Sequence, residues 1–216
     1  MGMTPTIDLS HLAVTRGLVG YWMGGVQGVP ALGTVRDLSS EGNDGTLMGS
    51  AYVDGDGLNV GSTESGMSFS NVSNRLGTSY TIMALVYSSL ATLYPTMYAI
   101  NGWAGSVVHF TNNGKCYAGT VQSSRILTSA GYIPRSKWIH LAISLNAGVG
   151  HSLYKNGVLT HTKTNLNLPD WGVGGGTWGT GANCLHGQIS DARIYNRVLS
   201  AAEVRAIYDN TKWRHQ

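Results

Sequence analysis

The stretch that decides the fold is GQISDARIYNRVLSAAEV, residues 187–204 of a 216-residue chain. Its first part belongs to a run from Leu185 to Tyr195 that predicts a strand, in which Asp191 and Arg193 lie two apart on one face and can bond to each other. Its last part begins a helix, because Ser200 and Glu203 form a capping box. The stretch therefore predicts a long strand followed by one short helix that ends the domain.

Short strands joined by tight turns are predicted for the rest of the chain. Ser79 to Ser88 is the most continuous apolar run, and its β-branched and aromatic residues favour a central strand buried on both faces. Lys137 to Asn146 alternates, with Ile139, Leu141, Ile143 and Leu145 opposite His140, Ala142 and Ser144. Asn156-Gly157 is the strongest hairpin signal. About a dozen strands and one helix predict an all-β fold, a two-sheet antiparallel jelly-roll sandwich with one short C-terminal helix.

Composition narrows the class of partner. Charged residues are only 12% of the chain and the net charge is +3, with Lys212 and Arg214 as the only local basic cluster, so we expect no nucleic-acid partner. No apolar run of about 18 residues exists, so we expect no membrane span. The two cysteines, Cys116 and Cys184, are consistent with either one disulfide or two buried thiols.

Three segments, in order, resemble the laminin-G-like (concanavalin-A-like lectin) jelly-roll family. They are GLVGYW (17–22) with DLS (37–39) and GNDGTL (42–47), then WIHLA (138–142) with LYKNG (153–157), and finally residues 187–204. The last is the most specific, and together they span nearly the whole chain from residue 17 to residue 208. The resemblance implies architecture rather than activity, because folds of this kind host unrelated functions.

The resemblance also implies a setting. Proteins of this fold normally work outside cells, yet residues 1–16 lack the basic and apolar regions of a signal peptide. A virus particle would resolve this mismatch, and the chain is similar to stand-alone phage virion proteins of this fold. We therefore expect a non-enzymatic virion structural protein (head decoration, tail or fibre), forming a homo-oligomer through its neighbouring subunits. The alternative is a carbohydrate-binding module or receptor-binding domain that recognises surface glycans, located outside the cell or at the cell surface.

The predicted organisation has three parts. Residues 1–16 read as an extended arm that either clasps a neighbouring subunit or is a loose terminus, residues 17–210 form the jelly-roll domain, and residues 211–216 form a frayed tail.

A glycoside hydrolase is only a remote alternative. Such enzymes need paired carboxylates close together, and no Asp or Glu lies between Glu64 and Asp170, where the best central strands are. We expect no catalytic residue, no zinc set and no cofactor. Calcium is the fairest exception, because relatives often bind it through loop acids. The two candidate loops carry Asp54 and Asp56, and Asp37, Glu41 and Asp44, but we favour no metal.

The tryptophans divide into two groups. Trp22 and Trp138 lie in strand patterns, and we expect them in the core. Three others lie in Gly-rich loops near polar side chains, a setting that suits stacking on sugar rings, contact with another subunit or capping of the open ends of the sandwich. The predicted ligand-binding residues are Trp103, Trp171 and Trp178, with Asp170, Asn101 and Asn183 as polar partners.

Overall fold

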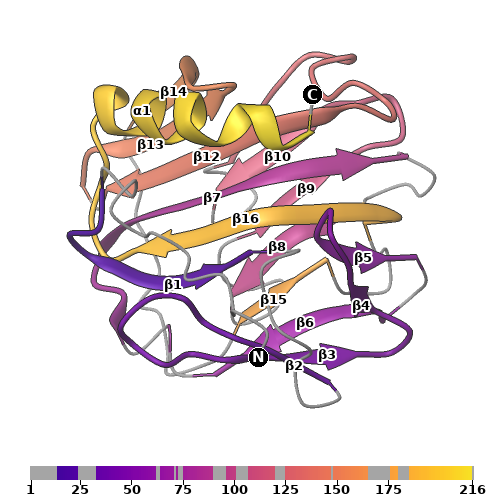
Figure 1. Cartoon of the computed structure of the whole chain (residues 1–216). Coiled ribbons are helices and arrows are strands. Elements are labelled where there is room, and N and C mark those ends of the chain that lie inside the picture. The colour runs from indigo at the N-terminus through magenta and orange to yellow at the C-terminus, as the bar shows by residue number, and fades with distance from the viewer. Residues whose placement is uncertain are drawn as a thin grey trace.

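Two antiparallel eight-stranded sheets face each other in the computed structural model (Figure 1). The structure describes residues 14–23, 33–61, 64–70, 72, 75–89, 96–100, 107–119, 125–146, 148–164, 176–179 and 185–215. The two-sheet antiparallel sandwich with one C-terminal helix confirms the predicted fold class.

The first sheet, sheet A, carries the longest strands. Its order is β14 (Val158–Thr164), β13 (Gly150–Lys155), β12 (Trp138–Asn146), β7 (Ser79–Ser88), β16 (Gly187–Tyr195), β5 (Leu58–Val60) and β4 (Tyr52–Val53), with β1 (Leu18–Trp22) also paired to β16. Strand β7 has the predicted bounds and is buried along nearly its whole length, because β12 and β16 flank it and both faces are covered.

The second sheet, sheet B, lies behind sheet A in Figure 1. Its order is β11 (Ile126–Leu127), β10 (Cys116–Gly119), β9 (Val107–Phe110), β8 (Thr96–Ile100), β15 (Gly176–Trp178), β6 (Gly66–Phe69), β3 (Gly45–Met48) and β2 (Thr34–Val35). The main core fills the space between the sheets, and its centre is aromatic. Trp22 stacks on Phe69 at 4.9 Å between ring centroids, and Phe69 lies 6.3 Å from Tyr98.

Helix α1 (Ala201–Thr211) covers the outer face of sheet A and forms a second apolar cluster there (Figure 1). The predicted capping box is confirmed: Ser200 Oγ accepts from the N–H of Glu203, and the Glu203 carboxylate accepts from the N–H of Ser200. Val204 and Ile207 are buried in this cluster with Met83 of β7. The helix therefore covers the part of this face around Met83.

The Asn156-Gly157 hairpin positions that helix. Both residues have positive φ, 51° and 74°, as a two-residue hairpin turn of this kind requires. A Cβ on Gly157 would lie 3.0 Å from side-chain atoms of Arg205 and Tyr208. Glycine is needed here both for the turn and for the close approach of α1 to the hairpin.

The first family-like segment forms a hydrogen-bonded corner at β1. Asp37 is buried, and its carboxylate accepts from the backbone N–H groups of Tyr21, Ser39 and Asn43 and from the Ser39 hydroxyl. The Trp22 indole donates to the carbonyl of Asn43 at 3.0 Å. The hydrogen bonds of Asp37, Asn43 and Trp22 therefore stabilise this corner of the fold.

A register shift in β16 turns a charged pair away from the main core. The shift falls between Ser190 and Arg193, and Asp191 within it has a φ of 51°. Ile189 and Ala192 face the main core, whereas Asp191 and Arg193 form the predicted ion pair at 2.6 Å. An extra residue in one strand exchanges the two faces of everything that follows it.

Both ends of the described chain contact the domain. Val14 is buried in the second cluster, and its carbonyl accepts from the Tyr195 hydroxyl at 3.1 Å. The rest of the predicted arm, residues 1–13, lies outside the described residues. The frayed tail is a wrong prediction for most of its length, because Thr211 ends α1 and Lys212–His215 form a 3₁₀ helix, here called the C-terminal segment.

The structure describes one of the two cysteines and the helix that ends the domain. Cys116 is a free, fully buried thiol in β10, and burial raises its pKa, which disfavours the reactive thiolate. Cys184 lies outside the described residues. Among the described helices, none is both long and apolar enough to cross a bilayer.

Candidate functional site

Of the six predicted ligand-binding residues, the structure describes Trp178. Trp103, Trp171, Asp170, Asn101 and Asn183 lie outside the described residues. Trp178 is described, and its predicted position in a loop is wrong: it ends β15 and is fully buried between the sheets.

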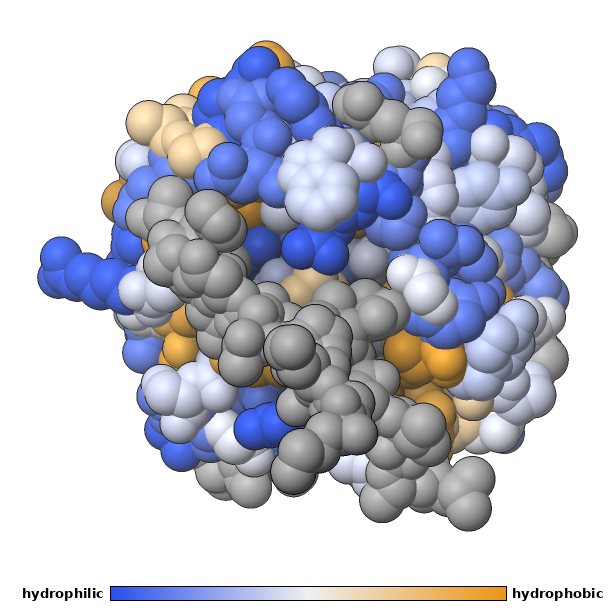
Figure 2. All heavy atoms as spheres, viewed as in Figure 1, coloured by the Kyte–Doolittle hydropathy of each residue, from blue (hydrophilic) through white to orange (hydrophobic). Residues whose placement is uncertain are grey.

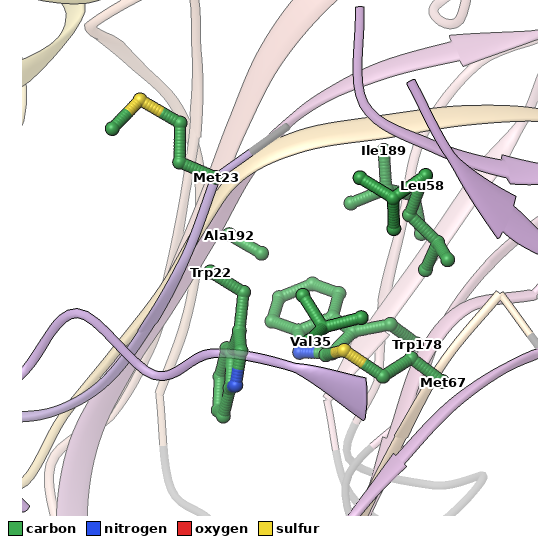
Figure 3. A pocket seen from close by; sticks show the side chains of 9 residues that line it. Trp22, Met23, Val35, Leu58, Met67, Trp178, Ile189 and Ala192 are labelled. Atoms are coloured by element: carbon green, nitrogen blue, oxygen red, sulfur yellow. The ribbon is translucent and has the colours of Figure 1, made fainter. Parts of the chain in front are cut away.

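Trp178 packs where no sugar can reach it. Its ring lies 4.9 Å from Tyr98 and 6.4 Å from Trp22, and Figure 3 shows it among apolar side chains of both sheets. The cavity beside it measures about 20 Å³, and apolar side chains line it. A space of this size holds about one water molecule, so it is not a ligand pocket.

Trp138 is the second tryptophan whose predicted place is wrong. It is half-buried and belongs to neither apolar cluster. Its neighbour Ile139 points into the main core, so alternation along β12 places Trp138 on the outer face of sheet A with His140. The alternation predicted for residues 137–146 already places Trp138 on the same face as His140.

Trp138 begins a row of side chains on the outer face of sheet A, here called the outer row. Cross-strand pairing sets Trp138 opposite Tyr87, Tyr87 opposite Gln188, Gln188 opposite Asn59, and Asn59 opposite Tyr52. The five strands that carry the row, β12, β7, β16, β5 and β4, are neighbours in sheet A in that order (Figure 1). Neighbouring strands lie about 4.8 Å apart, so the row is about 19 Å long.

The chemistry of the outer row is mixed. Trp138 and Tyr87 lie 5.7 Å apart between ring centroids, and Tyr52 at the far end is 57% exposed. Between them the Gln188 amide donates to the Asn59 side-chain oxygen at 2.7 Å. Each amide has two donors and an oxygen acceptor, so this pair keeps hydrogen-bonding capacity for a ligand. Figure 2, viewed from the same side as Figure 1, shows both hydrophilic and hydrophobic residues on this side of the molecule.

The C-terminal segment covers one end of the outer row. His215 stacks on Trp138 with 3.8 Å between ring centroids and 15° between ring planes. Within the described residues, the side chains of the segment donate hydrogen bonds to α1 alone, from Lys212 to Asp209 and from Trp213 to Asn210.

Two opposing contributions determine the stability of this cover. An aromatic stack is worth about 0.5–1.5 kcal/mol beyond the area it buries. Against it, His215 Nε2 and Arg214 Nε are buried without a hydrogen-bond partner among the described residues, and each such group costs about 1–3 kcal/mol. Burial also lowers the pKa of His215, although Asp56 and Asp191 act in the opposite direction and Arg214 acts with burial. The contact between the segment and the sheet is therefore weak.

Beside the outer row lies a buried polar group that serves the fold. His140 is 2% exposed, and burial lowers its pKa to about 4 despite the opposing charge of Asp191. Arg193 lies over the Tyr21 ring at 4.4 Å, and burial raises the pKa of the Tyr21 hydroxyl to about 12. His140, Tyr21 and Arg193 are all buried, so they do not offer a ligand an open surface.

The Asp37 carboxylate of the first candidate calcium loop does not fit a metal ion. Both Asp37 oxygens already accept two hydrogen bonds each, so N–H and O–H groups occupy the positions a cation would need. Asp54 accepts from the N–H groups of Asp56 and Gly57 within its own turn. Among the described residues, no three His, Cys, Asp or Glu side chains are close enough to hold a metal ion.

Sheet B offers a different outer face. Its corresponding cross-strand row is made of hydroxyl side chains without an aromatic ring: Thr34, Thr46, Ser68 and Thr177. An aromatic pair on that sheet, His109 and Tyr117, is stacked with 4.8 Å between ring centroids, and His109 is buried. The outer row of sheet A is therefore the better candidate for ligand stacking.

Comparison with known families agrees with the sandwich. A family model described as the concanavalin A-like lectin/glucanases superfamily matches residues 60–205, more than half of the chain. The chain belongs to this superfamily. A search of curated proteins found no match. Membership of the superfamily accounts for the jelly roll and leaves its binding and catalytic branches open.

Solved structures with the superfamily's jelly-roll fold include botulinum neurotoxin domains. The receptor-binding domain of the C/D mosaic serotype superposes with a TM-score of 0.72 at 14% identity, over 91% of this chain and 52% of that one. The serotype DC binding domain in complex with rat synaptotagmin II gives 0.70 at 14%, over 89% and 51%. A third structure is of botulinum neurotoxin type C, a toxin whose cell entry depends on interaction with two ganglioside molecules. It superposes with a TM-score of 0.69 at 14% identity, over 89% of this chain and 51% of that one. This chain spans about half the length of each, and at such identity the likeness concerns the fold.

Proposed function

We propose that this chain is a carbohydrate-binding module, and that its site is the outer row on sheet A. The observation that carries the proposal is the in-register order of ring, ring, amide, amide and ring across five adjacent strands. The botulinum neurotoxin type C structure, whose toxin interacts with gangliosides, has a chain about twice as long as this one. It therefore supports glycan binding as a class of function and not a particular ligand.

The outer row suits a sugar chain for two reasons. Sugar rings have apolar C–H faces that pack on flat aromatic side chains, and hydroxyl groups that need donors and acceptors. Trp138 and Tyr87 supply the rings at one end, and Gln188 and Asn59 supply both kinds of hydrogen-bonding group beside them. The length of the row, about 19 Å, suits an oligosaccharide of several units rather than a single sugar.

Replacing Trp138 with alanine is expected to lower glycan affinity at least about tenfold, because tryptophan side chains are among the usual binding hot spots. The parent chain is first screened on a glycan array that includes neutral, sialylated and bacterial surface glycans. Isothermal titration calorimetry with the best-binding oligosaccharide then compares the parent with Trp138→Ala and Tyr87→Ala.

Tyr117→Ala is the matched control, because Tyr117 is a half-buried ring on the outer face of sheet B. We expect its affinity to equal that of the parent. Equal losses in Tyr87→Ala and Tyr117→Ala would place the site elsewhere, and no binding by the parent to any arrayed glycan would end the proposal. Circular dichroism of each variant separates lost binding from lost structure.

The virion assembly role stays a prediction, and a truncation tests it. Val14 is part of the second cluster, so the arm should be removed at residue 13 to leave that contact in place. We expect light scattering to find a discrete oligomer for the full chain and a monomer for the chain without residues 1–13. A monomer in both forms would exclude self-assembly through the arm.

A further inference from the structure

We propose that the C-terminal segment Lys212–His215 is a displaceable cover of the outer row, and that His215 occupies the face of Trp138 on which a sugar ring would stack. This inference rests on the proposed carbohydrate-binding function. It adds a competition between the chain's own imidazole and the ligand for one aromatic face.

The His215 ring lies on Trp138 in the way that a bound sugar ring would lie. His215 lies 3.8 Å from Trp138 between centroids and 15° from parallel, close to the face-on arrangement that a sugar ring would adopt. On the described chain Trp138 also meets Tyr87, but at 51° between ring planes, so Tyr87 does not occupy a stacking face. A ligand stacked on the covered face of Trp138 must therefore move His215.

The segment is built to move. It follows the last residue of α1, and its side-chain hydrogen bonds within the described structure return to that helix through Asp209 and Asn210. Release from the sheet would break no described hydrogen bond between segment and sheet, and would expose His215 Nε2 and Arg214 Nε to water. Hydration of these two nitrogens thus offsets part of the loss of the stack.

The expected size of the effect follows from population shift. When only a fraction of molecules has the site open, the apparent affinity falls by that fraction. A stack of ordinary strength corresponds to about a two- to tenfold preference for the covered state. Removing the cover should tighten binding by the same factor.

Three variants test the cover by calorimetry with the best-binding oligosaccharide from the glycan array. His215→Ala, and a chain ending at Thr211, are expected to bind about two- to tenfold more tightly than the parent. Val149→Ala is the matched control: Val149 is 61% exposed and belongs neither to the C-terminal segment nor to the outer row, so its affinity should stay that of the parent.

A second measurement follows the cover directly. In the free chain the ring current of Trp138 should shift the His215 ring protons upfield in the NMR spectrum, with the signals assigned from their loss in His215→Ala. Saturating oligosaccharide should return them to the position of an exposed histidine. Parent-like affinity in both cover variants, or an unmoved His215 signal in the bound chain, would overturn the cover while leaving the glycan site standing. No glycan binding in the parent or in the uncovered variants would instead overturn the proposed function.

Discussion

Replacing Asp191 with asparagine is expected to lower the free energy of unfolding by about 3 kcal/mol or more. The Asp191 and Arg193 side chains are 2% and 3% exposed and lie 2.6 Å apart. Without the carboxylate, the Arg193 guanidinium becomes an uncompensated buried charge over the Tyr21 ring. Asparagine matches aspartate in size and tolerates the φ of 51° at this position, so the variant isolates the charge.

Urea denaturation followed by tryptophan fluorescence measures this loss. Glu41→Gln is the control, because it breaks the Arg75–Glu41 pair, whose side chains are 46% and 28% exposed. Exposed pairs contribute about 0–1 kcal/mol, and we expect no more here. Adding Arg193→Met to Asp191→Asn should restore part of the stability, since no charge then stays buried. A loss below about 1 kcal/mol in the single variant would contradict a stabilising role for the pair.

Acid is expected to destabilise the chain well before its carboxylates are protonated. Burial lowers the pKa of His109, His140 and His151 to about 4 each, with Arg125 and Lys163 adding to the effect at His109 and His151 respectively. In the unfolded chain a histidine has a pKa of about 6.5, so the unfolded state binds more protons between these values. The stability is present in full above pH 6.5 and is lost as the pH falls from about 6.5 to about 4.

The size of this effect is large for a marginally stable domain. A tenfold change in an equilibrium is worth about 1.4 kcal/mol, so each histidine accounts for about 3 kcal/mol at most. Urea denaturation at a series of pH values over this interval measures it. His140→Gln should flatten the curve by the contribution of one proton and leave the other two. A free energy of unfolding that stays constant over the interval would show that these imidazoles are not buried in solution.

The strands and the helix were predictable because local signals determine them. The run Ser79–Ser88, the Asn156-Gly157 turn and the Ser200–Glu203 capping box each act within a few residues, and the structure contains all three as predicted. The Asp191–Arg193 pair was predictable for the same reason, since both belong to one strand.

The candidate site was harder to predict because no single segment contains it. Tyr52, Asn59, Tyr87, Trp138 and Gln188 come from five strands that are neighbours only after the sheet has formed. Alternation placed Trp138 with His140 on one face of its strand, but not which face looks outward. Trp178 was predicted in a loop because glycines surround it, yet pairing with β6 and β8 draws it into the core.

The sequence by itself determined the all-β class, the positions of the main strands, the capped helix and the superfamily, because turn chemistry, alternation and capping act over short distances along the chain. Only the tertiary structure decided which tryptophan is buried and which lies outside, that five side chains form one row, and that His215 covers Trp138. Those relations depend on strand order, on the register shift in β16 and on where α1 ends, and each is set by contacts between segments far apart in the sequence.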